Sequence, residues 1–174
     1  MSRSRGRPLP QTTRSPLVVD VSDRQTLLRV SPRGLERLVR TALAVEGIEQ
    51  AEIGVVLVDD RRIAAVHRRW LGLAGPTDVI TFDLSAGTAG PPRAGVLAGD
   101  IVVSTETARR VARSVGWTPR LELSYYIVHG LLHLTGYDDH TAADRRQMRA
   151  RERVVMKACG LPVPPRTKAA GTSS

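Results

Sequence analysis

Apolar residues follow two different periods along this chain. Four segments rich in β-branched residues, with alternating or continuous apolar positions, are typical of strands, and they cover residues 17–21, 51–60, 77–84 and 96–104. Elsewhere, apolar residues recur three or four positions apart, which is the period of a helix. Five such segments run between Pro32 and Gly47, Asp60 and Gly72, Thr105 and Gly116, Pro119 and Gly136, and Ala142 and Gly160.

The order of these elements, β-α-β-α-β-β-α-α-α, predicts an α+β fold in which a four-stranded sheet packs against about five helices. The length of 174 residues suits one domain, which we place at residues 17–160. The segment 85–95 is a loop rich in Gly and Pro. Residues 1–16 and 161–174 are rich in Ser, Pro and Gly, so we expect a disordered N-terminal arm and a disordered C-terminal tail.

Charge is unevenly placed along the chain. The net charge is +9, and six of the basic residues lie in the two tails, where no acid accompanies them. They are Arg3, Arg5, Arg7, Arg14, Arg166 and Lys168. A basic arm suits a polyanion partner. Aromatic residues make up only 3% of the chain, so we expect nucleic acid to be bound mainly by charge and only thinly by stacking.

Composition also excludes some classes of protein. A single cysteine, Cys159, excludes a disulfide framework and fits a reducing compartment. The chain contains no run of about 18 apolar residues, so no membrane span is predicted. The N-terminal arginines have no apolar stretch behind them, so no secretory signal is indicated. We therefore expect a cytoplasmic protein with no membrane partner.

Three of the four histidines lie in the segment HGLLHLTGYDDH, residues 129–140. His129 and His133 are four apart, which puts both imidazoles on one face of a helix. Gly136 lets the chain turn sharply after the helix, and His140 follows within reach. Three protein ligands and an open fourth position are typical of a catalytic zinc site. Nickel or copper would also suit imidazole ligands.

The residue after the first histidine argues against a zinc protease. Those enzymes use H-E-x-x-H, in which the glutamate is the general base. This chain has Gly130 at that position, and the nearest acids in sequence are Glu122, Asp138 and Asp139.

The same segment resembles the H-G-x-L-H-L-x-G-Y-D-H signature of the YbeY family of endoribonucleases. Two further segments agree: GPTDVITF (75–82) is similar to the P-T-D-V-L-S-F strand of the family, and GDIVVS (99–104) to its G-D-I-x-I-S strand. The resemblance spans residues 17–160. It implies a zinc-dependent, single-strand-specific endoribonuclease that acts in rRNA maturation, including the 3′ end of 16S rRNA, and in ribosome quality control. Single-stranded rRNA, the small ribosomal subunit and ribosomal proteins are the partners it implies.

Carried over by position, the resemblance implies one zinc ion held by His129, His133 and His140. This chain has G-Y-D-D-H where the family usually has G-Y-D-H, so Asp138 or Asp139 is an alternative third ligand. A second departure replaces the tyrosine-arginine pair of the family, whose arginine is taken to act on RNA phosphate. Here the pair reads Trp70-Leu71, and Arg68 or Arg69 is the candidate replacement for that arginine.

The last predicted helix is a candidate RNA or ribosomal-protein surface through Arg145, Arg146 and Arg149. The alternative is an ordinary solvated face, partly neutralised by Asp144 and Glu152. We interpret Asp78 and Asp100 as structural hydrogen-bonding acids at strand ends.

Two other functions stay open at this stage. The protein could be an RNA-binding factor of ribosome assembly with a structural zinc, which chelation would unfold. It could also be a metallohydrolase of a peptide or another small substrate, which requires an acid near the metal-bound water. For RNA cleavage, the sequence does not choose between attack by water and attack by the 2′-OH of the RNA, and the product termini distinguish the two.

Overall fold

The computed structural model describes residues 17–85 and 96–163. The N-terminal arm, nearly all of the Gly/Pro loop and the tail after residue 163 lie outside the described residues. Within the described ranges, four strands and five helices follow each other in the predicted order. They are β1 (Val18–Asp23), α1 (Pro32–Val45), β2 (Ala51–Val58), α2 (Asp60–Leu71), β3 (Val79–Asp83), β4 (Leu97–Ser104), α3 (Thr105–Val115), α4 (Pro119–Leu134) and α5 (Ala142–Ala158).

The predicted α+β class and four-stranded sheet are confirmed. The strand order is β1-β2-β4-β3, in which β1, β2 and β4 are parallel and β3 pairs with β4 antiparallel at the edge. The strand predicted at 51–60 is two residues shorter because Asp59 caps α2, where its side chain accepts a hydrogen bond from the amide of Arg62. The strand predicted at 77–84 starts later, at Val79.

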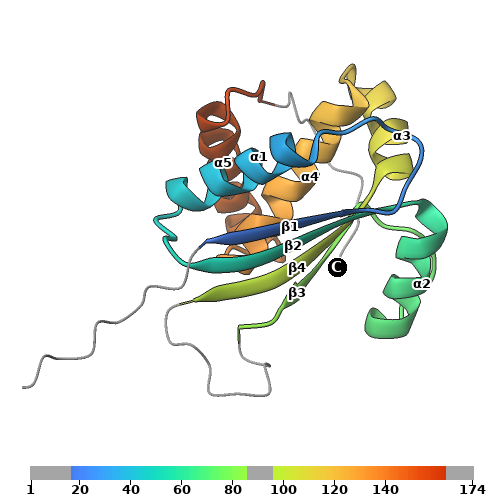
Figure 1. Ribbon diagram of the computed structural model, residues 1–174, viewed down its shortest axis with the longest axis horizontal. Coiled ribbons are helices and arrows are strands. Elements are labelled where there is room, and N and C mark those ends of the chain that lie inside the picture. Colours follow the sequence, from blue (N-terminus) through green and yellow to red (C-terminus); the bar gives the residue numbers. More distant parts are fainter. Residues whose placement is uncertain (1–16, 86–95, 164–174) are drawn as a thin grey trace, which may run out of the picture.

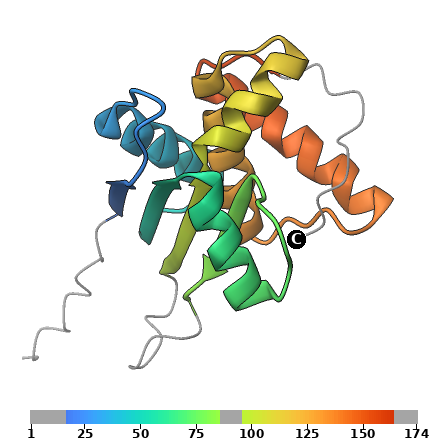
Figure 2. The ribbon, with the colours of Figure 1, turned by 90° about the vertical axis from the view of Figure 1, so that its right-hand side faces the viewer.

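The two faces of the sheet are covered differently. Helices α1, α4 and α5 lie on one side, and α2 lies on the other (Figures 1 and 2). Alternation along the strands explains this, since successive side chains point to opposite faces. One set of strand side chains belongs to the main core. On the side of α2, side chains from the strands pack with Ile63 of α2 in a smaller cluster of Val58, Ile63, Ile80 and Val102.

Helix α4 is the central helix of the larger layer. Leu123, Ile127 and Leu131 are almost completely buried, because α4 contacts the sheet, α1, α3 and α5. A helix that is apolar nearly all round is expected at such a place. None of the described helices is long and apolar enough to cross a membrane.

A missing side chain brings α4 close to the sheet. A β-carbon placed on Gly130 would lie 3.0 Å from methyl groups of Ile101 and Thr81, and 3.3 Å from one of Val79. Contacts that close leave no room for a larger residue. Helix α4 is therefore held close to strands β3 and β4 at Gly130, next to His129 in the chain.

Helices α2 and α3 begin side by side and cap each other. The Asp60 carboxylate accepts hydrogen bonds from Ser104 Oγ and Thr107 Oγ1, and Glu106 Oε2 accepts one from the Asp60 amide at 2.8 Å. Arg110 pairs with the second Asp60 oxygen at 2.7 Å. The carboxyl ends of β2 and β4 are thus held together by polar groups from both helices.

Candidate metal centre

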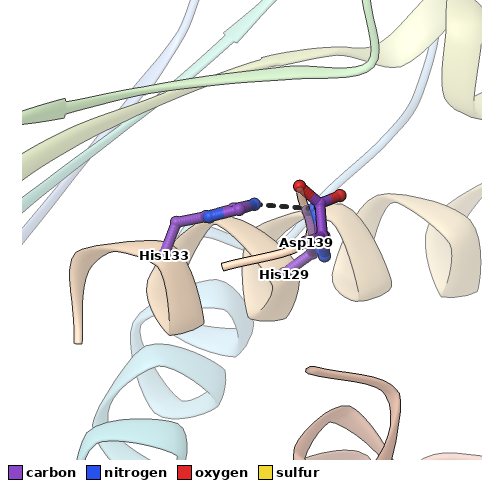
Figure 3. A group of neighbouring side chains, drawn as sticks. All are labelled: His129, His133 and Asp139. Carbon is purple, nitrogen blue, oxygen red and sulfur yellow. Dashed lines mark hydrogen bonds and ion pairs between the residues drawn. The ribbon is translucent and has the colours of Figure 1, made fainter. Parts of the chain in front are cut away.

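His129 and His133 point at one another from successive turns of α4 (Figure 3). Their Nε2 atoms lie 3.0 Å apart. Zinc bonds of about 2.0–2.1 Å in a tetrahedral arrangement place neighbouring ligand atoms about 3.3 Å apart. The two nitrogens therefore converge as ligands of one ion would.

Glu152 of α5 fixes the orientation of His129. The Nδ1 of His129 donates to Oε1 of Glu152 over 2.8 Å, and Glu152 is only 4% exposed. Because Nδ1 carries the proton, Nε2 presents its lone pair towards His133. A metal-binding histidine usually donates a hydrogen bond from its other ring nitrogen to a carboxylate, and this bond makes the ring a stronger ligand.

The chain returns to the histidines through a turn at the end of α4. Gly136 has a φ of 100°, a conformation that favours glycine. The amide of Gly136 bonds the carbonyl of His133, and the amide of Tyr137 bonds that of Leu132, which closes the helix end. The backbone of Tyr137 also makes a hydrogen bond with the imidazole of His133. This turn places residues 138–140 next to the two imidazoles.

The third member of the group is Asp139. One atom from each of His129, His133 and Asp139 lies within 4.8 Å of the others, and Asp139 Oδ2 is 4.0 Å from His129 Nε2. His140 lies in a second group with Asp138 and Asp139, its side chain is 66% exposed, and its Nε2 is 3.3 Å from Asp138 Oδ1. Asp139, an alternative raised by the extra residue, thus lies with the two histidines, and the expected His140 lies in the neighbouring group.

The two histidines have opposite pKa shifts. Burial acts to lower the pKa of His129, but the hydrogen bond and charge of Glu152, helped by Asp78 and Asp139, outweigh it and raise the pKa. Burial lowers the pKa of His133, and the neighbouring His129 lowers it further. A proton at this site therefore prefers His129, where it competes with a metal ion for Nε2.

The donor set fits zinc. Two imidazoles and one carboxylate are ligands of catalytic zinc sites, in which a fourth position stays open to water or substrate. The place where a protease would carry its glutamate is filled by the sheet, because Gly130 contacts Ile101 and Thr81. The residues present can therefore hold a metal ion, and the acid of H-E-x-x-H has no room beside them.

Glu152 is the functional residue that the sequence reasoning missed. It was assigned to the exposed arginine face of the last helix, and that interpretation is wrong because Glu152 is buried against His129. The spacing of apolar residues in the sequence does indicate that Glu152 is buried. Glu152 stands four residues after Met148 and four before Met156, both fully buried, so it occupies the apolar stripe of α5.

The predicted arginines occupy several places. Arg145 donates from Nη1 to the carbonyls of Asp139 and His140, at 3.0 and 2.7 Å, so it holds the loop that carries the third ligand. Arg146 is exposed and Arg149 is half-buried on the same helix. Arg68 and Arg69 are exposed on α2.

Comparison with known proteins agrees with this geometry. The family model described as "Endoribonuclease YbeY" matches residues 20–160. The chain is 41% identical over 145 residues to an Endoribonuclease YbeY of Anaeromyxobacter sp. strain Fw109-5, covering 83% of this chain and 73% of that protein. It is 40% identical over 135 residues to that of Moorella thermoacetica, covering 73% and 85%.

A solved structure shares the fold. The solution structure of TM1509 from Thermotoga maritima superposes with a TM-score of 0.57 at 23% identity, covering 82% of this chain and 89% of that one. The family model and the relatives confirm the resemblance seen in the histidine segment and the two strands. This chain belongs to the YbeY family of endoribonucleases.

Proposed function

We propose that this protein cuts single-stranded rRNA during rRNA maturation, using one zinc ion held by His129, His133 and Asp139. Family membership supports the class of reaction. The observation that carries the site is the 3.0 Å approach of the two Nε2 atoms while Glu152 occupies the other nitrogen of His129. Imidazoles arranged in this way serve a metal better than a packing role, since buried polar nitrogens need partners.

The residues around the site have separate tasks. When bound, zinc polarises a phosphoryl oxygen and lowers the pKa of water, which suits it to phosphodiester cleavage. Glu152 keeps His129 in the tautomer that binds metal. Arg145 fixes the backbone of Asp139 and His140. Asp78, directly before β3, adds negative charge near His129.

We place the RNA backbone along the basic surface of α5. Arg146 is exposed there and Arg149 is half-buried. Each phosphate neutralised by an arginine releases a counterion, so the affinity falls as salt is raised. The site would act in the cytoplasm on the small ribosomal subunit, with ribosomal proteins helping to present the strand.

A purely structural metal is the weaker candidate. Helix α5 already packs on the main core through Met148, Val155 and Met156, all of which are almost completely buried. Burying such side chains contributes roughly 1.5–3 kcal/mol each. The fold therefore has support between α4 and α5 that does not involve the histidines.

Cleavage of purified rRNA fragments tests the proposal. The wild type and His133→Ala are incubated with a single-stranded fragment and with the same fragment paired to its complement, and metal content is measured on both proteins. We expect wild type to bind about one zinc and to cut only the single strand, and His133→Ala to do neither. Equal cleavage by the two proteins would contradict the proposal. A 2′,3′-cyclic phosphate on the products would identify attack by the RNA's own 2′-OH.

A further inference from the structure

A large aromatic side chain stands exposed at the end of α2. Trp70 is 63% exposed, more than any other large apolar residue of the part of the chain that the structure describes. Leu71 and Leu73 beside it are 45% and 43% exposed. The other tryptophan, Trp117, is half-buried and packs edge-on against Tyr125.

The Trp70 ring is held in place although it is exposed. Phe82 of β3 meets it edge-to-face, with ring centroids 5.9 Å apart and an interplanar angle of 73°. The Arg69 guanidinium lies over the ring, 5.5 Å from its centroid. Contacts of these two kinds are each favourable by about 0.5–1.5 kcal/mol. The ring is therefore a fixed surface feature rather than a loose side chain.

The chemistry of this surface suits one kind of ligand. A flat ring flanked by exposed guanidinium groups, those of Arg68 and Arg69, matches a nucleotide, which offers a flat base and a phosphate. An apolar protein partner would have to strip water from both cations. We propose that Trp70 is a stacking platform for an unpaired nucleobase of the bound RNA strand. This inference rests on the proposed function and adds to it a residue that determines specificity.

The platform is joined to the metal centre by a short, anchored loop. Gly72 ends α2 with a φ of 70°, and Nδ1 of the buried His67 donates to the carbonyl of Gly75 over 3.0 Å. The loop ends at Asp78, whose carbonyl accepts from the amide of Ser104 at 2.9 Å and whose charge acts on His129. Six residues therefore connect the end of α2 to an acid whose charge acts on a candidate metal ligand, and we infer that one RNA strand contacts both Trp70 and the metal centre.

Stacking on Trp70 would give the enzyme a physical source of strand selectivity. In a duplex both faces of each base are covered by neighbouring bases, so the base must be unstacked before it meets the indole. An unpaired strand bears little of that cost, and base–aromatic stacking contributes about 1–3 kcal/mol. The scarcity of aromatic residues predicts only thin stacking, and one well-placed ring is enough to supply it at a single base.

Fluorescence of Trp70 tests the platform directly. The double variant Trp117→Phe, His133→Ala leaves Trp70 as the one tryptophan and prevents cutting, so binding is measured apart from cleavage. We expect a single-stranded oligoribonucleotide to quench the fluorescence of Trp70. An abasic strand of equal length and charge should leave this fluorescence unchanged. In the His133→Ala background, Trp70→Ala should weaken binding of the normal strand by roughly fivefold to a hundredfold, while Trp70→Phe should keep most of the affinity.

Controls separate this proposal from the proposed nuclease activity. Val18→Ala removes another exposed apolar side chain, 46% exposed on β1, and should leave affinity unchanged. Equal binding of the normal strand by the Trp70→Ala protein and its parent, or an equal loss with the abasic strand, would overturn the platform. Quenching with no cleavage by the wild type would overturn the nuclease proposal and leave the platform standing.

Discussion

The Oε1 atom of Glu152 lies 2.8 Å from Nδ1 of His129, so one acid of α5 orients a candidate metal-binding ring of α4. The position of Glu152 is set by the core, because Met148 and Met156, one turn away on either side, are completely buried. The ligand geometry therefore depends on the packing of two helices that lie next to each other in the main core.

Removing the charge of Glu152 should weaken metal binding. Glu152→Gln keeps the shape and an oxygen acceptor but loses the carboxylate that makes His129 a stronger ligand. Zinc affinity, measured by competition with a chelating dye, is expected to fall about 10- to 100-fold. Glu46→Gln is the matched control. Glu46, at the end of α1, pairs with Arg151 of α5, the helix that carries Glu152, and not with a histidine. Equal affinities of Glu152→Gln and wild type would contradict the orienting role.

Substitutions at the two neighbouring positions should separate the candidate third ligands. Asp139 lies in the group with His129 and His133, while the exposed His140 side chain faces Asp138. We expect Asp139→Ala to lose most of its zinc after dialysis and His140→Ala to retain it, as measured by elemental analysis of the purified proteins. The reverse pattern would restore His140 as the third ligand.

Enlarging Gly130 should destabilise the fold. In Gly130→Ala the new methyl group meets side chains of β3 and β4 at 3.0–3.3 Å, and overpacking of this kind costs about 1–3 kcal/mol. Thermal unfolding measures this cost. Gly34→Ala in α1 is the control, because its new methyl would meet only Ser31 and helix propensity favours alanine by up to about 1 kcal/mol. A Gly130→Ala protein as stable as wild type would disprove the tight contact.

The junction of α2 and α3 should be sensitive to acid. Burial acts to raise the pKa of Asp60, but hydrogen bonds from Ser104, Thr107 and Arg110 outweigh it and hold the pKa below its ordinary value of 3.8. A lowered pKa in the folded state means that the stabilisation is fully present above about pH 4 and is lost as the pH falls through the folded value.

The contribution of Asp60 to the free energy of unfolding is measured by denaturant unfolding of wild type and Asp60→Asn at several pH values. At neutral pH the variant should lose about 1–3 kcal/mol, the usual effect of removing a charged hydrogen-bond acceptor, and the difference should shrink below pH 4. Asp20→Asn, exposed on β1, should stay within about 0.5 kcal/mol of wild type. A difference between Asp60→Asn and wild type that does not change with pH would contradict the ionised role of Asp60.

The sequence predicted the elements well because their signals are local. The helices expected to end at Gly72 and Gly116 do end there, and both glycines have the left-handed conformation. The spacing of His129 and His133 also sufficed to place both rings on one face of α4. Each of these features depends on residues a few positions apart.

Features that depend on packing between distant segments were harder to predict. Burial of Glu152 requires α5 to lie on α4. The choice between Asp139 and His140 depends on how the turn after Gly136 directs the chain, which the extra residue changes. The exposure of Trp70 depends on α2 lying on the face of the sheet opposite α1, α4 and α5 (Figure 2). Local patterns carry little information on such contacts.

Zinc titration of the metal-free protein tests the central claim most directly. Protein stripped by a chelator is refilled stepwise with zinc, and the rate at which it cuts a single-stranded rRNA fragment is measured at each step. Cleavage should be absent without metal, rise in proportion to added zinc and level off at about one ion per chain, while circular dichroism shows the fold unchanged throughout. Full cleavage by the metal-free protein, or a fold that forms only on addition of zinc, would contradict a catalytic metal at His129, His133 and Asp139.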